Sequence, residues 1–246
     1  MIYLFVFLSG ALAWFFSTLV TGGAATLLLP VLGLVLGAQL VPPVLTVASL
    51  IANPSRVALF SAHVDWHILR YLLPGTLIGA VSGGWAFTLL EARWLELLVG
   101  LFLVSTVLQY RFNQSARPFT MKTVWFFPLG LVVAGISGVI GAVGPVFNPF
   151  FLNHGTSKEA LVATKSVNSL AMQVFKLMTY GSLGIINTRI LGWGVLLGLG
   201  AVCGIFLARK HLVDMSDDRF RQLLYWFMPA SGLLMLWKSA QSFFSG

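Results

Sequence analysis

Apolar stretches separated by short polar breaks run along almost the whole chain. A helix that spans a bilayer needs about 20 predominantly apolar residues, so long stretches of this kind predict membrane helices. The second and seventh stretches are too short to cross comfortably. The ten stretches cover residues 3–19, 24–36, 42–62, 68–89, 95–110, 124–140, 146–152, 160–182, 190–207 and 223–242. We therefore predict an all-α, polytopic integral membrane protein.

Each of the two short stretches follows a glycine-rich break. Thr21, Gly22 and Gly23 precede the second stretch, and Gly141 and Gly144 lie just before the seventh. Glycine permits sharp backbone turns and the close approach of a ligand. These positions predict broken helices, and the sequence leaves open whether the short pieces cross the membrane or return as re-entrant hairpins.

The first five stretches correspond in order to the last five. Residues 79–83, GAVSG, recur 121 residues later as GAVCG at 200–204, with four identities in five. Pro30 after the first glycine break is matched by Pro149 after the second. We interpret the chain as two homologous membrane repeats, residues 1–116 and 117–246.

Lysine and arginine residues indicate how the two repeats are oriented, because cytoplasmic loops carry an excess of them. If each repeat crosses the membrane an odd number of times, one face receives nine basic residues and the other three; four crossings per repeat would give six and six. The uneven split predicts inverted-topology repeats in an inner (plasma) membrane, with both termini non-cytoplasmic. The nine are Arg70, Arg111, Arg117, Lys122, Lys158, Arg209, Lys210, Arg219 and Arg221, and the three are Arg93, Arg189 and Lys238.

Composition agrees with lipid as the main solvent for this chain. Hydrophobic residues make up 58% and charged residues only 9%, whereas about a quarter of the residues of a soluble domain are charged. The net charge of +8 is scattered between apolar stretches, so we expect no nucleic-acid partner. The sequence does not show whether chains associate into a homo-oligomer.

Three basic residues, Arg56, Lys165 and Lys176, lie inside apolar stretches. A charge at membrane depth costs about 2.5–3.5 kcal/mol on insertion scales and usually marks a pathway or a partner. Pairing with acids is disfavoured because all seven acids lie at or near the ends of stretches. Snorkelling to an interface is the alternative, most credible for Lys176. We predict that these cations face an aqueous cavity and attract a small anionic substrate.

Polar neighbours and the glycine breaks complete the predicted site. A helix that restarts after a break presents unpaired N–H groups to an anion; the alternative is that the glycines only permit tight helix packing, and that serine and asparagine only bond to neighbouring helices. The predicted substrate-binding residues are Thr21, Gly22, Gly23, Ser49, Asn53, Arg56, Gly141, Gly144, Lys165, Asn168, Gln173 and Lys176.

No other motif carries recognisable chemistry. His63, Asp65 and His67 have a spacing that could suggest a metal site, but such a loop is more typical of ordinary interfacial polarity, and we expect no metal and no cofactor. The chain has no GxSxG, HExxH or P-loop pattern, so we expect no enzyme.

The chain resembles the sulfite exporter TauE/SafE family. The resemblance is carried by Thr21-Gly22-Gly23-Ala24-Ala25 with Pro30, by Gly141-Ala142-Val143-Gly144-Pro145 with Pro149, and by Val64-Asp65-Trp66. It implies export of sulfite, an organosulfonate or a related sulfur oxyanion. Family members commonly have longer glycine runs than this chain. An anion channel and a membrane-embedded assembly or insertion factor with a peptide-binding groove are the alternatives.

Overall fold

The computed structural model describes residues 1–19, 24–91, 94–95, 97–102, 121–141 and 144–211, with the single residues 237 and 240. Every regular element in this part of the chain is a helix, as the apolar pattern predicts. The α-helices are α1 (Ile2–Leu19), α2 (Ala24–Leu36), α3 (Val41–Phe60), α4 (Trp66–Thr88), α6 (Phe126–Ile140), α7 (Asn148–Asn153), α8 (Lys158–Ser182) and α9 (Thr188–His211), and the 3-10 helices are η1 (Ser61–His63), η2 (Thr123–Trp125) and η3 (Gly144–Phe147). The all-α prediction is confirmed.

The outer surface of these helices is apolar. Three described stretches are long and apolar enough to cross a bilayer: Val41–His63, Thr123–Ile140 and Thr188–Ala208. Large apolar side chains point outward, where only lipid could cover them without cost. They include Leu4, Leu12, Ile78, Trp85, Val132, Phe206 and Leu207. The chain is a polytopic membrane protein.

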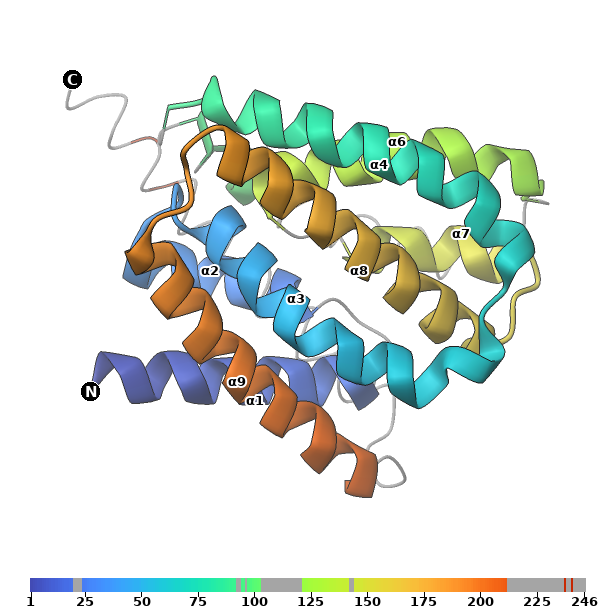
Figure 1. Cartoon of the computed structure of the whole chain (residues 1–246), viewed down its shortest axis with the longest axis horizontal. Coiled ribbons are helices and arrows are strands. Elements are labelled where there is room, and N and C mark those ends of the chain that lie inside the picture. Colours follow the sequence, from blue (N-terminus) through green and yellow to red (C-terminus); the bar gives the residue numbers. More distant parts are fainter. Residues whose placement is uncertain are drawn as a thin grey trace.

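Three pairs of helices build the bundle (Figure 1). Helix α4 lies against α6 along one side, and α1 lies against α9 along the other. Between these pairs, α3 packs against α8, and they also contact α9 and α4 respectively. Helices α3 and α8 therefore form the centre, and they carry most of the buried polar side chains: Thr46, Ser49, Asn53, Thr164, Ser166, Asn168, Gln173, Lys176 and Thr179.

Helices α4 and α9, which follow α3 and α8 in the sequence, each begin with a side-chain N-cap. Asp65 accepts a hydrogen bond of 3.0 Å from the N–H of Ile68 at the start of α4. Asn187 accepts one of 2.9 Å from the N–H of Ile190 at the start of α9. Both are preferred N-cap residues. The N–H of Asp65 also donates to Thr164 Oγ1 at 2.9 Å, which ties this connection to α8.

The repeated glycine sequence lies where helices approach most closely. A Cβ atom on Gly79 or Gly83 would lie 2.2 or 2.1 Å from a carbonyl oxygen of α6. A Cβ atom on Gly200 or Gly204 would lie 2.1 or 2.0 Å from a carbonyl oxygen of α1. Small residues permit such close approach between membrane helices. The GAVSG and GAVCG sequences thus make the same kind of contact in the two halves of the chain.

Replacing Gly200 by alanine is expected to destabilise the bundle, because the new methyl group would collide with the backbone of α1. Overpacking of this kind costs about 1–3 kcal/mol. Gly192→Ala is the matched control on the same helix, since a Cβ atom there would meet nothing within 4 Å. Thermal unfolding in detergent measures both variants. Equal melting temperatures for Gly200→Ala and Gly192→Ala would contradict the close packing of α1 against α9.

Candidate functional site

A cavity of about 100 Å³, with both polar and apolar side chains in its lining, lies beside the central helices α3 and α8. It reaches the end of these helices where Phe60 closes α3 and Leu161 lies in the first turns of α8. Its volume suits a few water molecules or one small polyatomic ion, and it is smaller than the usual 300–1,000 Å³ of a drug-sized site. Thirteen residues line it: Ser17, Thr18, Asn53, Arg56, Phe60, Phe147, Leu161, Val162, Lys165, Ser166, Asn168, Ser169 and Met172.

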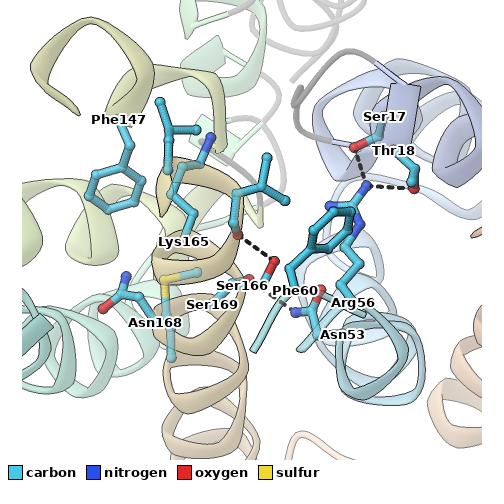
Figure 2. Close-up of a pocket in the computed structure, with 13 residues that line it drawn as sticks. Ser17, Thr18, Asn53, Arg56, Phe60, Phe147, Lys165, Ser166, Asn168 and Ser169 are labelled. Atoms are coloured by element: carbon cyan, nitrogen blue, oxygen red, sulfur yellow. Dashed lines mark hydrogen bonds between the residues drawn. The ribbon is translucent and has the colours of Figure 1, made fainter. Parts of the chain in front are cut away.

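Arg56 brings the first positive charge into the cavity. Figure 2 shows its guanidinium directed toward the end of α1, where Nη2 donates to Ser17 Oγ at 2.8 Å and to Thr18 Oγ1 at 3.1 Å. Both partners are neutral hydroxyls, so they orient the charge without neutralising it. In the described part of the chain, only this nitrogen of the guanidinium has hydrogen-bond partners. The remaining N–H groups of the guanidinium, on Nη1 and Nε, are suited to donate to an anion.

Lys165 brings the second positive charge, from α8. Its Nζ donates to the amide oxygen of Asn148, the first residue of α7. An amide oxygen carries only a partial charge, and this hydrogen bond orients the ammonium. Lys165 therefore links α8 to the short helical segment that follows the second glycine break.

Neutral polar groups form part of the cavity wall, beside apolar side chains such as Phe60 and Phe147. Asn53 Nδ2 donates to Ser169 Oγ at 3.0 Å, which joins α3 to α8 across the cavity (Figure 2). Asn168 is only 1% exposed, and its amide oxygen has no hydrogen-bond partner among the described residues. This oxygen can only accept a hydrogen bond, so a water molecule or a protonated group would satisfy it, whereas the NH₂ group of the same amide can donate to an anion.

The charge balance of the lining favours an anion. Arg56 and Lys165 are cationic, and none of the described lining residues is acidic. Two cations that share a buried, low-dielectric space repel each other, and an anion placed between them relieves that repulsion. Hydroxyl and amide donors on the same wall could complete the coordination of an oxyanion.

The structure brings four of the residues predicted from the sequence to this cavity: Asn53, Arg56, Lys165 and Asn168. Ser49 and Gln173 are buried, each 4% exposed, and are not part of the lining. The amide oxygen of Gln173 also has no hydrogen-bond partner in the described part of the chain.

The glycine breaks are described only in the second half of the chain. Helix α6 ends at Ile140, and Gly141 follows with φ of 103°, a left-handed backbone that favours glycine. Gly144 begins the 3-10 helix η3. Thr21, Gly22 and Gly23 lie outside the described residues. Coordination of an anion by N–H groups at the breaks stays a prediction.

Lys176 lies apart from the cavity lining. It is fully buried, and its Nζ donates to the carbonyl oxygens of Ser137 at 3.0 Å and Gly141 at 3.4 Å. The hydroxyl oxygen of Ser137 lies 3.5 Å from the same nitrogen. The side chain of Lys176 therefore points into the bundle and not to its outer surface. Its charge lies instead at the C-terminal end of α6, where cations are favoured.

Several lining residues escaped the sequence prediction. Ser17 and Thr18 lie shortly before the first glycine break, and Asn148, which bonds to Lys165 but is not part of the lining, shortly follows the second, so proximity to the breaks was a usable signal. Ser169 is one helical turn after Lys165 and shares its face of α8. Serines in membrane helices usually bond to neighbouring helices, and only the packing of α3 against α8 places this one at the cavity.

Comparison with known families adds one finding. The family model described as sulfite exporter TauE/SafE matches residues 6–235, nearly the whole chain. Searches of curated proteins and of solved structures gave no significant match. The matched range includes every residue that lines the cavity.

Proposed function

Because the chain belongs to the sulfite exporter TauE/SafE family, we propose that it is a secondary transporter that exports a small sulfur-containing anion. Sulfite, an organosulfonate or a related sulfur oxyanion is the substrate. The observation that carries this proposal is the pair of cations, Arg56 and Lys165, in a small cavity whose described lining has no acid.

Each lining group has a role in binding. The guanidinium of Arg56 donates to two oxygens of the anion, and the ammonium of Lys165 binds it as a point charge. Asn53 and Ser169 hold α3 and α8 together at the depth of the site through their mutual hydrogen bond. The amide of Asn168 provides a further polar contact on the α8 wall.

The cavity faces the cytoplasm in the proposed orientation. The nine-residue basic face includes Arg70 at the start of α4 and Lys158 at the start of α8, so this end of the bundle is cytoplasmic under the positive-inside rule. The cavity lies toward the same end, between the last residues of α3 and the first turns of α8. Both termini are then non-cytoplasmic, and the halves 1–116 and 117–246 form two inverted repeats.

A membrane potential that is negative on the cytoplasmic side favours movement of the anion out of the cell. Outward movement of an anion is favoured by about 2.3 kcal/mol per charge per 100 mV. The cavity lining provides no acidic proton relay, since none of its described residues is a carboxylate. A divalent anion could therefore leave the cell without a coupled proton.

Flux of labelled sulfite from proteoliposomes tests the proposal. We expect saturable flux that rises as the compartment on the cavity side is made negative and that organosulfonates inhibit. A single-channel conductance far above transporter turnover would indicate an anion channel instead. No flux above empty liposomes, combined with a protein that stays bound through purification, would contradict transport and favour an assembly factor.

A further inference from the structure

Lys176 is a buried cation that does not line the cavity. It is 0% exposed, and within the described part of the chain its hydrogen bonds go to residues at the C-terminal end of α6. Removing a charged ammonium from water is costly, and a membrane protein that only needed to stabilise this helix end could use a neutral donor. The contacts that Arg56 makes in the first half of the chain indicate why a charged side chain occupies this position.

Arg56 and Lys176 make the same kind of contact in their own halves of the chain. Arg56 lies near the C-terminal end of α3 and donates to the last turn of α1, at Ser17 and Thr18. Lys176 lies near the C-terminal end of α8 and donates to the last turn of α6, at Ser137 and Gly141. In each half, a glycine-rich break follows the helix end that the cation holds.

Other contacts indicate the same correspondence between helices of the two halves. Asp65 begins α4 with an N-cap bond shortly after α3, and Asn187 begins α9 with an equivalent bond shortly after α8. The repeated glycines then pack α4 against α6 and α9 against α1. Helices α1, α3 and α4 therefore correspond to α6, α8 and α9, and Arg56 corresponds to Lys176.

The two cations lie toward opposite ends of the central helix pair. The bond from Asn53 to Ser169 and the bond from Asp65 to Thr164 place the end of α3 beside the start of α8, so the two helices are antiparallel (Figure 1). Lys176 is eleven residues, or about 16 Å, along α8 from Lys165. Arg56 is thus near one face of the membrane and Lys176 nearer the other.

The environments of the two cations differ in one respect, since Arg56 lines the cavity whereas Lys176 is fully buried and belongs to no part of that lining. Tyr180 is fully buried one turn beyond Lys176, and its hydroxyl donates to the carbonyl oxygen of Gly138. Gly141 lies so close to the start of α3 that a Cβ atom there would be 3.0 Å from the Cα of Pro42. Among the described residues, these contacts of α6 with α3 and α8 close the space around Lys176.

We propose that Lys176 is the counterpart of Arg56 at the closed end of the pathway. In this conformation it positions the end of α6 by holding its carbonyl oxygens, and in the opposite conformation it faces the departing anion. An anion is a stronger partner for an ammonium than a carbonyl oxygen is, so arrival of the substrate competes with the contact that keeps this end shut. The inference rests on the proposed transport function and names Lys176 as a positioning residue for it.

A variant that still binds sulfite but has lost most of its flux would support this role. Lys176→Met should keep the rise in melting temperature that sulfite induces through the Arg56 cavity, with a half-saturating concentration within about twofold of wild type, and should reduce flux about tenfold or more. Lys176→Arg, which keeps the charge, should restore part of the flux. Flux per folded protein equal to wild type in Lys176→Met would overturn the proposal, and so would a loss of sulfite binding as large as that of Arg56→Gln.

Cysteine labelling tests the same role without removing the charge. The lone cysteine, Cys203, is first replaced by serine, and then Ser17 and Ser137, the neighbours of Arg56 and Lys176, are each replaced by cysteine. A membrane-impermeant thiosulfonate reagent should modify Ser17→Cys from one face of membrane vesicles and Ser137→Cys from the other face. Modification of Ser137→Cys from the same face as Ser17→Cys, or from neither face in a variant that still transports, would overturn the proposal.

Failure of this inference is distinct from failure of the transport function. If the wild-type chain shows no flux of sulfite or of an organosulfonate, the proposed function fails. If the wild-type chain transports and the Lys176 and Ser137 variants behave as in the contrary outcomes, only the counterpart role of Lys176 fails.

Discussion

At the sulfite concentration that half-saturates the wild-type protein, Arg56→Gln is expected to abolish nearly all of the rise in melting temperature. Glutamine can still bond to the hydroxyls of Ser17 and Thr18, so the fold keeps its local contact while the cavity loses one of its two charges. A charge-assisted hydrogen bond is worth about 1.5–3 kcal/mol, so affinity should fall about 10- to 100-fold. Flux in proteoliposomes should fall in parallel. A sulfite titration followed by thermal unfolding measures the loss of binding.

Arg70→Gln is the matched control for this experiment. It removes the same charge from an exposed position near the start of α4, outside the cavity lining. We expect sulfite to stabilise Arg70→Gln as it does the wild-type protein. Undiminished stabilisation of Arg56→Gln would remove Arg56 from the site, and equal losses in both variants would show that the effect is one of overall charge.

Asn168→Asp is expected to have the second large effect, because it introduces a negative charge with almost no change in shape. The side chain is buried in the cavity wall, 1% exposed. A carboxylate there would add a negative charge to the cavity wall and repel the substrate. At a separation of about 5 Å and an effective dielectric constant of about 20, the repulsion corresponds to a loss of affinity on the order of 100-fold. Anion binding and flux should both report this loss.

Asn187→Asp provides the same chemical change away from the cavity. Asn187 caps the start of α9 through its side-chain oxygen, and aspartate is an equally good N-cap residue. We expect this variant to bind and transport the anion normally. If Asn168→Asp also retains wild-type affinity, the amide of Asn168 does not face the bound anion.

The fold class could be predicted because bilayer spanning imposes a length and an apolar composition on each helix. The stretches predicted at 42–62 and 68–89 correspond to α3 (Val41–Phe60) and α4 (Trp66–Thr88). The break at Gly141 was also predictable, since the chain there adopts a backbone that favours glycine. Most of the predicted stretches at 223–242 and 95–110 lies outside the described residues, and the inverted arrangement of the repeats stays a proposal.

The difference between Lys165 and Lys176 could not be predicted from the sequence. Eleven residues are about three helical turns, so both side chains lie on the same face of α8 and look equivalent in a helical pattern. Their depth along α8 decides their surroundings. Lys165 lines the cavity beside α7, whereas Lys176 meets the end of α6 outside that lining. Only the packing of α6 and α7 against α8 separates these roles.

The polar partners of the cations depend on tertiary contacts in the same way. Ser17 and Thr18 come from α1, and Asn148 comes from α7, at sequence separations that no helical periodicity connects to Arg56 or Lys165. The sequence predicted that the cations Arg56 and Lys165 need polar partners, and the structure identifies neutral side chains that orient them.

Anomalous diffraction from crystals soaked with selenite, the selenium analogue of sulfite, tests the central claim most directly. We predict one selenium peak per chain in the cavity beside α3 and α8, within hydrogen-bonding distance of the Arg56 guanidinium and the Lys165 ammonium, and no such peak in crystals of Arg56→Gln. A selenium peak elsewhere with an empty cavity, in a protein that transports sulfite, would contradict the claim that these two cations bind the anion.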